Sequence, residues 1–529
     1  MNNKKIQVWL PLLFSITMIV GMWLGYKMRD NIPGKSFFYM EKKRPVQEIM
    51  ELIQTKYVDD VNVDSLADTA IQAMLSKLDP HSIFIPAEQL QTVKEDLAGK
   101  FFGVGIEYSL YDDTVNVTNV LKDGPSFKAG IMTGDKFITI DDSLVAGNKT
   151  DAERLRKLLR GDRGTTVNVV FMRGKEQKKA TITRDAIPLA SVDASYIIGS
   201  GVGYIRLNKF SQATYHEFMD ALMALKKQGL QKLILDLRGN GGGVLDEAIE
   251  IADELLPGDK LITYTQGKHI AKKEYRCRRE GQFETGPLVV LADEGSASAS
   301  EVLMGALQDW DRATIIGRRS FGKGLVQDQF ELSDNSALRL TIARYYTPLG
   351  RSIQRSYSNG GKAYFNEISK RFHNGETQSA DSVKNDTSKV FKTPAGKVLY
   401  AAGGITPDYF VALDTTTISI STARVYAAGS IDNYAYHYYL QHTDQLKNYK
   451  TPADFIKGFT FTDADWKDFT NSTAKDSVNL DMIPAKERTV ITNRIRSSIA
   501  RQVWRTEGMV EVLNTDDNAI KKALEVLQK

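Results

Sequence analysis

The spacing of hydrophobic residues divides the chain into five consecutive stretches. The first is an uncharged run of 19 residues at 8–26 (VWLPLLFSITMIVGMWLGY), with Lys and Arg on both sides. As a helix that rises ~1.5 Å per residue, it would span about 28 Å, enough for a bilayer core. No A-x-A cleavage pattern follows, so we favour a retained anchor over a cleaved signal peptide. We therefore expect residues 1–30 to form an N-terminal signal anchor that crosses a membrane at 8–26.

The next two stretches differ in period. Between 44 and 97 apolar residues recur every three to four positions, which predicts helices. Between 98 and 187 short alternating runs such as TVNVVFM are separated by glycine turns, with one helical stretch at 151–159. This pattern predicts strands. The sequence therefore indicates an N-terminal helical region followed by a small β-rich domain.

From 190 to 413 the predicted elements alternate between strand and helix. Apolar runs such as LILDLR and PLVVLA are followed by amphipathic stretches at 246–256 and 298–310. Such alternation is typical of an α/β core. Within it, residues 356–394 are rich in Ser, Asn, Lys and Gly, which predicts a polar surface insertion. Residues 414–529 read as a helical region to which no role can be assigned.

Composition excludes several classes of protein. The 529 residues are 42% hydrophobic and 25% charged, as in globular proteins, and at ~150 residues per domain they predict three to four domains. A net charge of +4 is too small to indicate nucleic acid binding. The single cysteine, Cys277, excludes an intramolecular disulfide and a cysteine-based zinc site, and the six histidines do not cluster. We expect neither a metal nor a cofactor.

A serine-rich segment, GSASASE, lies between a predicted buried strand and a predicted helix. Ser298-x-x-Glu301 matches a capping box, so a purely structural role is one interpretation. A nucleophilic role for Ser298 requires in addition a base that accepts the hydroxyl proton and donors for the oxyanion.

The glycine loop 239–243 (GNGGG) could supply such donors. It directly follows the strand LILDLR, and backbone N–H groups of glycines are open to a ligand. A tight turn without function is the alternative. A phosphate loop is excluded, because no G-K-[ST] is present and Val244 occupies the position of the third glycine in G-x-G-x-x-G.

Lys323, in the segment FGKG, is a candidate base. Lysine accepts a proton only when neutral, so its environment must lower its pKa, and flanking glycines in an apolar stretch allow burial. A solvated loop lysine is the alternative. Gln327 follows four residues later; in an extended chain it would lie about 13 Å away at ~3.3 Å per residue, so contact needs a bend at Gly324 or a folded lysine side chain.

Two rival hydrolase patterns fit poorly. Ser320-x-x-Lys323 matches S-x-x-K and 333–335 matches S-D-N, as in penicillin-recognising enzymes. However, the S-x-x-K precedes a strand pattern rather than opening a helix, and K-T-G is absent. A Ser-His-Asp hydrolase is also disfavoured, since the sequence contains no G-x-S-x-G.

Several motifs together resemble the carboxyl-terminal processing peptidases, also called tail-specific proteases. They are GSASASEV, FGKGLVQ, LDLRGNGGG, TPLGRSIQ, GGITPD and YVDD…LDPHS, and the similarity covers about residues 45–413. The resemblance implies that Ser298 is the nucleophile, Lys323 the general base and Gln327 the residue that orients it. It further implies oxyanion donation by the backbone N–H groups of Ala299 and Gly242.

The same resemblance implies the fold. It predicts a multi-domain α+β chain with a Clp-peptidase-like and crotonase-like α/β catalytic core at 190–413, a PDZ domain at 98–187, and helical regions at 44–97 and 414–529. The carboxylate-binding loop of the PDZ domain would use the backbone N–H groups of five residues. These are Phe102, Gly103, Val104, Gly105 and Ile106.

We therefore interpret the chain as a serine endopeptidase that recognises protein C-termini through its PDZ domain. Its expected partners are protein or peptide substrates held by their free C-terminus and the inner membrane through the N-terminal anchor. We expect the catalytic part in the periplasm and no nucleic acid; a homo-oligomer is left open. The alternatives are a catalytically silent PDZ adaptor, which would need a misplaced dyad, and an acyl-CoA enzyme on the related fold, which would leave Ser298 and Lys323 without a role.

Overall fold

The computed structural model describes residues 3–31, 45–383, 386–401, 403–414, 419–474, 478–480 and 483–528. Outside this set lie residues 1–2 of the predicted anchor, residue 44 of the predicted N-terminal helical region, residues 384–385 of the insertion, residue 402 of the predicted core, and residues 415–418, 475–477, 481–482 and 529 of the predicted C-terminal region. The chain forms two compact units, Met1–Met74 and Leu75–Lys529.

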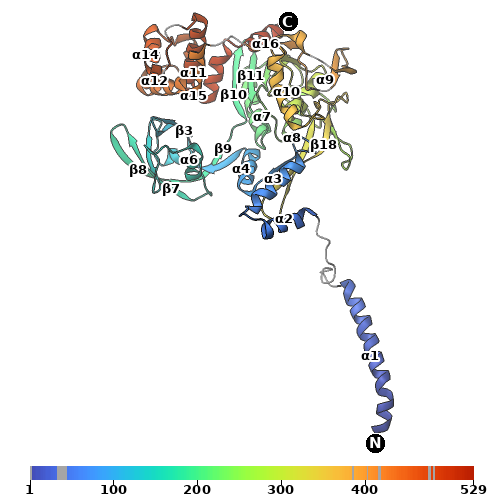
Figure 1. Ribbon diagram of the computed structural model, residues 1–529. Coiled ribbons are helices and arrows are strands. Elements are labelled where there is room, and N and C mark those ends of the chain that lie inside the picture. The colour runs from blue at the N-terminus through green and yellow to red at the C-terminus, as the bar shows by residue number, and fades with distance from the viewer. Residues whose placement is uncertain are drawn as a thin grey trace. The chain divides into compact units, whose positions relative to one another are not determined.

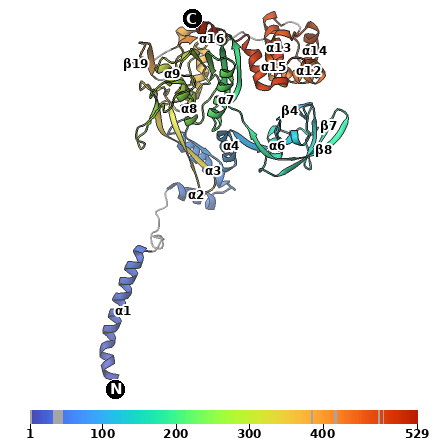
Figure 2. The ribbon, with the colours of Figure 1, turned by 180° about the vertical axis from the view of Figure 1, so that it is seen from behind.

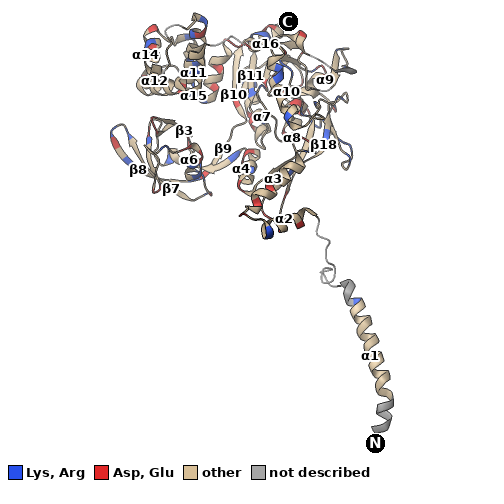
Figure 3. Ribbon diagram, in the orientation of Figure 1, with Lys and Arg blue, Asp and Glu red and all other residues tan. Residues whose placement is uncertain are grey.

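The first unit consists of helices. Helix α1, Asn3–Asn31, contains the window Trp9–Lys27, which is long and apolar enough to cross a membrane, with a mean hydropathy of 1.6. Figure 3 shows no charged residue along this window before its end at Lys27. The side chains of the window are exposed within the structure, as fits a signal sequence or an anchor. Helices α2, Pro45–Lys56, and α3, Val63–Leu75, follow as predicted.

The second unit is built around a six-stranded sheet in the order β10-β11-β12-β15-β16-β21. Figure 1 labels its first two strands, β10 and β11. Apart from the antiparallel β10, neighbouring strands are parallel. The strands are β10 Val192–Gly199, β11 Val202–Leu207, β12 Lys232–Asp236, β15 Leu288–Ala292, β16 Thr314–Gly317 and β21 Tyr409–Phe410. The predicted α/β alternation is confirmed for this sheet.

Both faces of the sheet are buried, because its central strands are apolar at successive positions. Helices α7 Thr214–Lys227, α8 Leu245–Leu255 and α9 Ala299–Asp309 cover one face (Figure 2). Helix α16, Asn518–Gln528, covers the other face. Alternate strand residues point to each side. The first side contains Ile205, Leu233, Leu235, Val290 and Ala292, and the second Tyr204, Ile234, Val289, Leu291 and Ile316.

A second sheet contains strands that the sequence pattern does not assign to it. It consists of β1 Ile83–Ile85, β13 Leu261–Gln266, β14 Lys273–Arg276, β17 Leu325–Glu331 and β18 Ala337–Tyr346. The run LITYT, expected in the α/β alternation, thus pairs with β14 and β18 instead. Strand β1 lies in a region where only helices are predicted. In both cases the result depends on which other strands are available for pairing, and hydrophobic periodicity does not specify those partners.

The β-rich domain forms its own sheet, β3-β4-β5-β7-β8, with β6 beside β5. Its elements are β3 Ile106–Tyr111, β4 Thr114–Val120, α5 Pro125–Lys128, β5 Lys136–Ile140, β6 Ser143–Leu144, α6 Ala152–Leu159, β7 Thr166–Arg173 and β8 Glu176–Thr183. Strands β2 Lys100–Gly103 and β9 Asp185–Pro188 pair where the chain enters and leaves the domain. Helix α4, Ala87–Ala98, precedes it.

The 356–394 segment differs from its prediction as a polar surface insertion. It contains helix α10 Gly361–His373, the 3-10 turn Ala380–Ser382 and strand β19 Asp386–Lys392, which pairs with β20 Val398–Ala401. Tyr364 and Arg371 of α10 are buried, and the Arg371 guanidinium donates to the Ser320 carbonyl at 2.7 Å. Polar composition concealed this helix because its buried contacts are largely ionic.

The predicted C-terminal helical region is confirmed. It comprises α11 Ile420–Ala427, α12 Ser430–Leu446, α13 Pro452–Gly458, α14 Asp463–Thr473 and α15 Ala485–Asn514, followed by α16. Aromatic and aliphatic side chains of α11 to α15, among them Tyr434, Phe455 and Phe469, form a separate core. Helix α15 is broken at Trp504 and Arg505.

Candidate active site

Three loops meet at one edge of the main sheet. The glycine loop follows β12, the serine-rich segment follows β15, and the segment with Lys323 follows β16. These strands are adjacent and parallel, so their carboxyl ends lie at the same edge. The fold therefore brings together segments that are far apart in the sequence, at the position where open α/β sheets bind ligands.

Ser298 occupies a strained turn immediately before α9. Its φ of 57° and ψ of −116° are unusual for a residue with a side chain. The turn places Ser298 at the helix N-terminus, where backbone N–H groups lack helical partners. Ser298 is partly exposed and lines a cavity of about 480 Å³ together with Lys323, Gln327 and Gly242.

The neighbouring serines are structural. Ser296 is buried and its hydroxyl donates to the Leu237 carbonyl at 2.8 Å. Ser300 is buried and its hydroxyl donates to the Asn240 carbonyl at 2.9 Å. The Ser300 bond attaches the serine-rich segment to the glycine loop, and the Ser296 bond attaches it to Leu237, between β12 and that loop. Of the three serines, Ser298 is the one that faces the cavity.

The glycine loop approaches Ser298 closely. Gly242 has φ of 92°, and a Cβ there would lie 2.6 Å from the Ala297 carbonyl oxygen and 2.7 Å from Ser298 Cβ. A side chain cannot be accommodated at this position. The Gly242 N–H, a predicted oxyanion donor, donates to Asn240 Oδ1 at 2.9 Å. For the Ala299 N–H, the other predicted donor, no partner is found within the described part of the chain.

A buried carboxylate, Glu301, joins the serine and lysine segments. It accepts hydrogen bonds from the backbone N–H groups of Ser298 at 3.0 Å and Lys323 at 2.8 Å. It also accepts from the Gly322 N–H and the Ser320 hydroxyl. Burial raises the pKa of Glu301, although these hydrogen bonds oppose the shift. The sequence indicated Glu301 only as a capping residue, since its contacts with 320–323 depend on tertiary structure.

Lys323 lies in an environment that favours its neutral form. Burial and, to a lesser extent, the positive charge of Arg339 lower its pKa to about 8, whereas Glu301 and Asp79 oppose the shift. A lysine with this pKa is partly neutral near neutral pH, as a general base requires. Arg339, on β18, is a residue that sequence analysis missed.

Gln327 and Lys323 line the same cavity without a direct contact. The Gln327 amide donates to Thr341 Oγ1 at 3.4 Å, and Thr341 Oγ1 donates to Asp79 Oδ1 at 3.1 Å. An irregularity in the pairing of β17 with β18 falls between Val326 and Gln327. Within the described residues no hydrogen bond joins Gln327 to Lys323. Catalytic hydrogen bonds often form only when substrate is bound.

The LDPHS segment adds a second set of polar groups beside the cavity. Asp79 accepts from the backbone N–H groups of His81 and Ser82, which fixes the turn. His81 Nε2 lies 3.0 Å from the Tyr364 hydroxyl. Burial and, to a lesser extent, the nearby positive charge of Lys323 lower the pKa of His81 to about 4. His81 is therefore neutral at neutral pH and does not add positive charge near Lys323.

The predicted carboxylate-binding loop connects β2 to β3. The carbonyls of Val104 and Gly105 accept from the N–H groups of Ser126 and Leu121, so the loop is fixed to its own domain. Gly105 has φ of 74°, which favours glycine. Strand β3 pairs with β4 on one side, and the strand order leaves its other side at the edge of the sheet. An edge strand of this kind can accept an extended peptide. No group of three or more potential metal ligands occurs among the described residues.

Comparison with known proteins gives consistent matches along the chain. The model of peptidase family S41 matches residues 201–360, and that of the PDZ domain matches 103–183. A carboxy-terminal-processing protease of Bartonella bacilliformis is 36% identical over 313 residues, which cover 58% of this chain and 71% of that protein. The chain belongs to peptidase family S41. It is a serine-type peptidase with a PDZ domain, so the acyl-CoA enzyme and the silent adaptor are excluded.

Further matches extend the similarity to other parts of this S41 peptidase. A probable CtpA-like serine protease of Staphylococcus epidermidis is 32% identical over 366 residues, covering 66% of this chain and 73% of that protein. The solved photosystem II D1 C-terminal processing protease is 31% identical, covers 59% of this chain and 84% of that chain, and has a TM-score of 0.35. Residues 28–89 match the N-terminal domain of the activating protease CtpB. Residues 422–505 match a family of unknown function.

Proposed function

We propose that this S41 peptidase cleaves peptide bonds with Ser298 as nucleophile and Lys323 as general base. One observation carries the proposal. Ser298 and Lys323 line the same cavity, and the buried Glu301 binds the backbone N–H of both residues. The lowered pKa of Lys323 supplies the neutral amine that the reaction needs.

The chemistry follows from these positions. Neutral Lys323 Nζ takes the proton from Ser298 Oγ as this oxygen attacks the scissile carbonyl carbon. The resulting tetrahedral oxyanion collapses, the C–N bond breaks, and Lys323 returns the proton to the leaving amine. Lys323 then takes a proton from water as the water oxygen attacks the ester carbon; the acyl–Oγ bond breaks, and Lys323 returns the proton to Ser298 Oγ. Gln327 would position Lys323 after exchanging its contact with Thr341.

The Ala299 N–H at the start of α9 would be the first hydrogen-bond donor to the oxyanion. The positive end of the helix dipole favours negative charge there. Gly242 becomes the second donor once its N–H is released from Asn240 Oδ1. Rotation of the Asn240 side chain is opposed by the hydrogen bond from its amide to the Leu207 carbonyl at 3.0 Å. Substrate binding would have to displace the Asn240 oxygen from Gly242.

Substrates are proteins or peptides with a free C-terminus. The terminal carboxylate would bind the N–H groups of residues 102–106, and the preceding residues would extend β3. In this proposal the PDZ domain spans 98–187 and the catalytic core spans 190–413. We further propose that 8–26 is a retained anchor and that the catalytic part lies in the periplasm. The apolar helix α1, which is long enough to cross a membrane, supports this proposal.

The test compares wild type with Ser298→Ala, both as full-length protein in detergent micelles. An unfolded protein with a free C-terminus is incubated with each, and fragments are identified by mass spectrometry. Wild type should produce internal cleavages that are absent with Ser298→Ala. Fragments from both proteins alike would contradict the assignment of Ser298.

A further inference from the structure

Strand β3 exposes two different faces to its surroundings, because successive side chains of a strand point to opposite sides. Ile106 and Tyr108 pack against the core of the PDZ domain. Glu107 points the other way, and its carboxylate pairs with Arg505 at 2.7 Å and Arg501 at 3.1 Å. Both arginines belong to α15. The back of the strand that borders the proposed peptide groove therefore contacts the C-terminal helices.

Helix α12 makes a second contact with the same face. The rings of Tyr111 and Tyr436 lie 5.5 Å apart, and Tyr436 is fully buried. Leu440 follows Tyr436 by four residues and lies on the same face of α12. It packs against the turn at Gly134, where an added Cβ atom would lie 3.1 Å from Leu440 Cδ2. Tyr434 and Tyr438 point instead into the helical core. One face of α12 thus packs in the core of the C-terminal helices, and another face contacts the PDZ domain.

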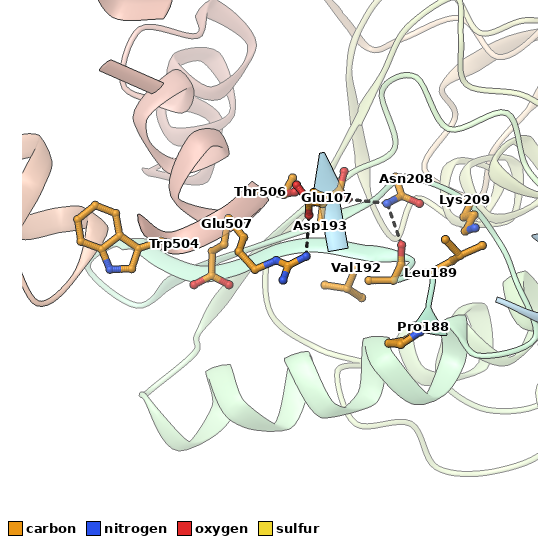
Figure 4. A pocket seen from close by; sticks show the side chains of 12 residues that line it. Glu107, Pro188, Leu189, Val192, Asp193, Asn208, Lys209, Trp504, Thr506 and Glu507 are labelled. Carbon is orange, nitrogen blue, oxygen red and sulfur yellow. Dashed lines mark hydrogen bonds and ion pairs between the residues drawn. The ribbon is translucent and has the colours of Figure 1, made fainter. Parts of the chain in front are cut away.

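Helix α15 links these contacts to the peptidase core. Before its break it carries Arg501; after the break Val510 packs on the main sheet and Asn514 Nδ2 donates to the Tyr196 hydroxyl at 2.7 Å. At the break Arg505 adopts φ of 60° and ψ of −149°, a conformation that strains any residue with a side chain. A cavity of about 690 Å³ adjoins the break and is lined by Glu107, Trp504 and Thr506 (Figure 4).

We propose that α11 to α14 and the part of α15 up to Arg505, here called the helical module, dock on the PDZ domain and hold it beside the peptidase core. The surface is the back of β3, which leaves its free edge open to a peptide. A held domain keeps a bound chain at high effective concentration near the cleft. This inference rests on the proposed function for its kinetic consequence, but the docking itself is independent of catalysis.

Docking is tested by the distance between two spin labels in the full-length protein in micelles. The labels are attached to cysteines introduced by Lys175→Cys, in the turn between β7 and β8, and Lys467→Cys, on α14, with Cys277→Ala removing the native thiol. Both lysines are exposed. We expect one narrow distance distribution by double electron–electron resonance. A broad distribution in this parent protein would overturn the proposal.

Reversal of the charges at Glu107, Arg501 and Arg505 tests whether these ion pairs hold the docked arrangement. Glu107→Arg places a third positive charge beside Arg501 and Arg505 and should broaden the distribution. Adding Arg501→Glu and Arg505→Glu should restore it. Glu176→Arg is the matched control, since this exposed glutamate on β8 pairs only locally with Lys178, and should leave it narrow. A narrow distribution after Glu107→Arg, or no recovery in the charge-swapped protein, contradicts docking through this ion pair.

The kinetic consequence is measured with a peptide that has a free C-terminal carboxylate. Glu107→Arg should raise KM roughly fivefold without changing kcat, because the bound chain is delivered less efficiently. The Kd for the same peptide, measured in the Ser298→Ala background, should stay constant. An equal rise in Kd would place the effect in the groove and overturn the positioning role. If wild type cleaves nothing, the proposed function fails, whereas the spin-label distances still decide the docking.

Discussion

The proposed peptidase cleft and the proposed carboxylate-binding loop would both present backbone N–H groups to a substrate, but they are built in different ways. The loop is one continuous segment, 102–106, held by hydrogen bonds from Ser126 and Leu121 within its own domain. The cleft combines three segments, and the buried Glu301 joins two of them. The geometry of the loop is therefore local, whereas the geometry of the cleft depends on how distant segments of the core pack together.

The largest effect is expected from Ser298→Ala. Loss of the nucleophile should lower kcat by roughly 10⁴-fold or more, with little change in stability. Ser296→Ala and Ser300→Ala should retain most activity but lose about 0.5–1.5 kcal/mol of unfolding free energy, because each removes one buried hydrogen bond to a carbonyl that keeps a backbone N–H partner. Peptide hydrolysis and urea denaturation check both. An inactive Ser296→Ala with wild-type stability would show that the nucleophile is misassigned.

Replacement of Lys323 should separate activity from stability. Lys323→Met should be inactive, because no base remains, yet more stable at pH 7. A pKa of about 8 against an ordinary 10.5 corresponds to a penalty of about 3 kcal/mol at 1.36 kcal/mol per unit. Below pH 8 both states hold the proton and the full penalty applies. Between pH 8 and 10.5 the unfolded chain holds more protons, so wild-type stability rises with pH.

Thermal melts at pH 6 and pH 9 check this prediction, with Lys323→Arg as the companion variant. Arginine stays charged, so this variant should be inactive and less stable than wild type. Wild-type kcat/KM should rise with pH around a midpoint near 8. A methionine variant that melts below wild type at pH 6 would mean that Lys323 is solvated, and its role as base would be lost.

Glu301→Gln should disturb the cleft without removing a reacting group. The amide keeps the shape of the side chain but loses the negative charge that accepts four hydrogen bonds, and bonds to charged groups contribute about 1.5–3 kcal/mol each. We expect kcat to fall by roughly tenfold to a hundredfold and the melting temperature to decrease. The control is Glu331→Gln, an exposed glutamate paired with Lys94. Equal kinetics for Glu301→Gln and wild type would contradict the joining role of Glu301.

The smallest effect is expected at the PDZ loop. Amidation of a substrate C-terminus removes the charge that 102–106 would bind, so KM should rise by roughly tenfold while kcat is retained. Peptides with apolar terminal residues should bind best. Hydrolysis of free and amidated versions of one peptide measures this. Identical KM values for the two would exclude carboxylate recognition by this loop.

The sequence determined the elements whose signal is local. The 3.6-residue period predicted helices α2, α3, α8 and α9, and alternation predicted β4 and β7. The spacing of Ser298, Lys323 and Gln327, together with the motifs of the family, indicated the catalytic chemistry. The capping pattern also drew attention to Glu301. These features depend on neighbours in the chain, so a single sequence contains them.

Tertiary structure decided everything that depends on distant segments. It paired LITYT with β18, buried Tyr364 and Arg371 of α10 in an insertion expected to be polar surface, and placed Arg339 beside Lys323. In the folded chain the Gly242 N–H donates to Asn240, and the Thr341 hydroxyl donates to Asp79, which lies 262 positions away in the sequence. Hydrophobic periodicity specifies which face of an element is buried, but not which other element covers it. The segments that pack around Lys323 remove it from water and place Arg339 near it, so the lowered pKa of Lys323 depends on the folded core.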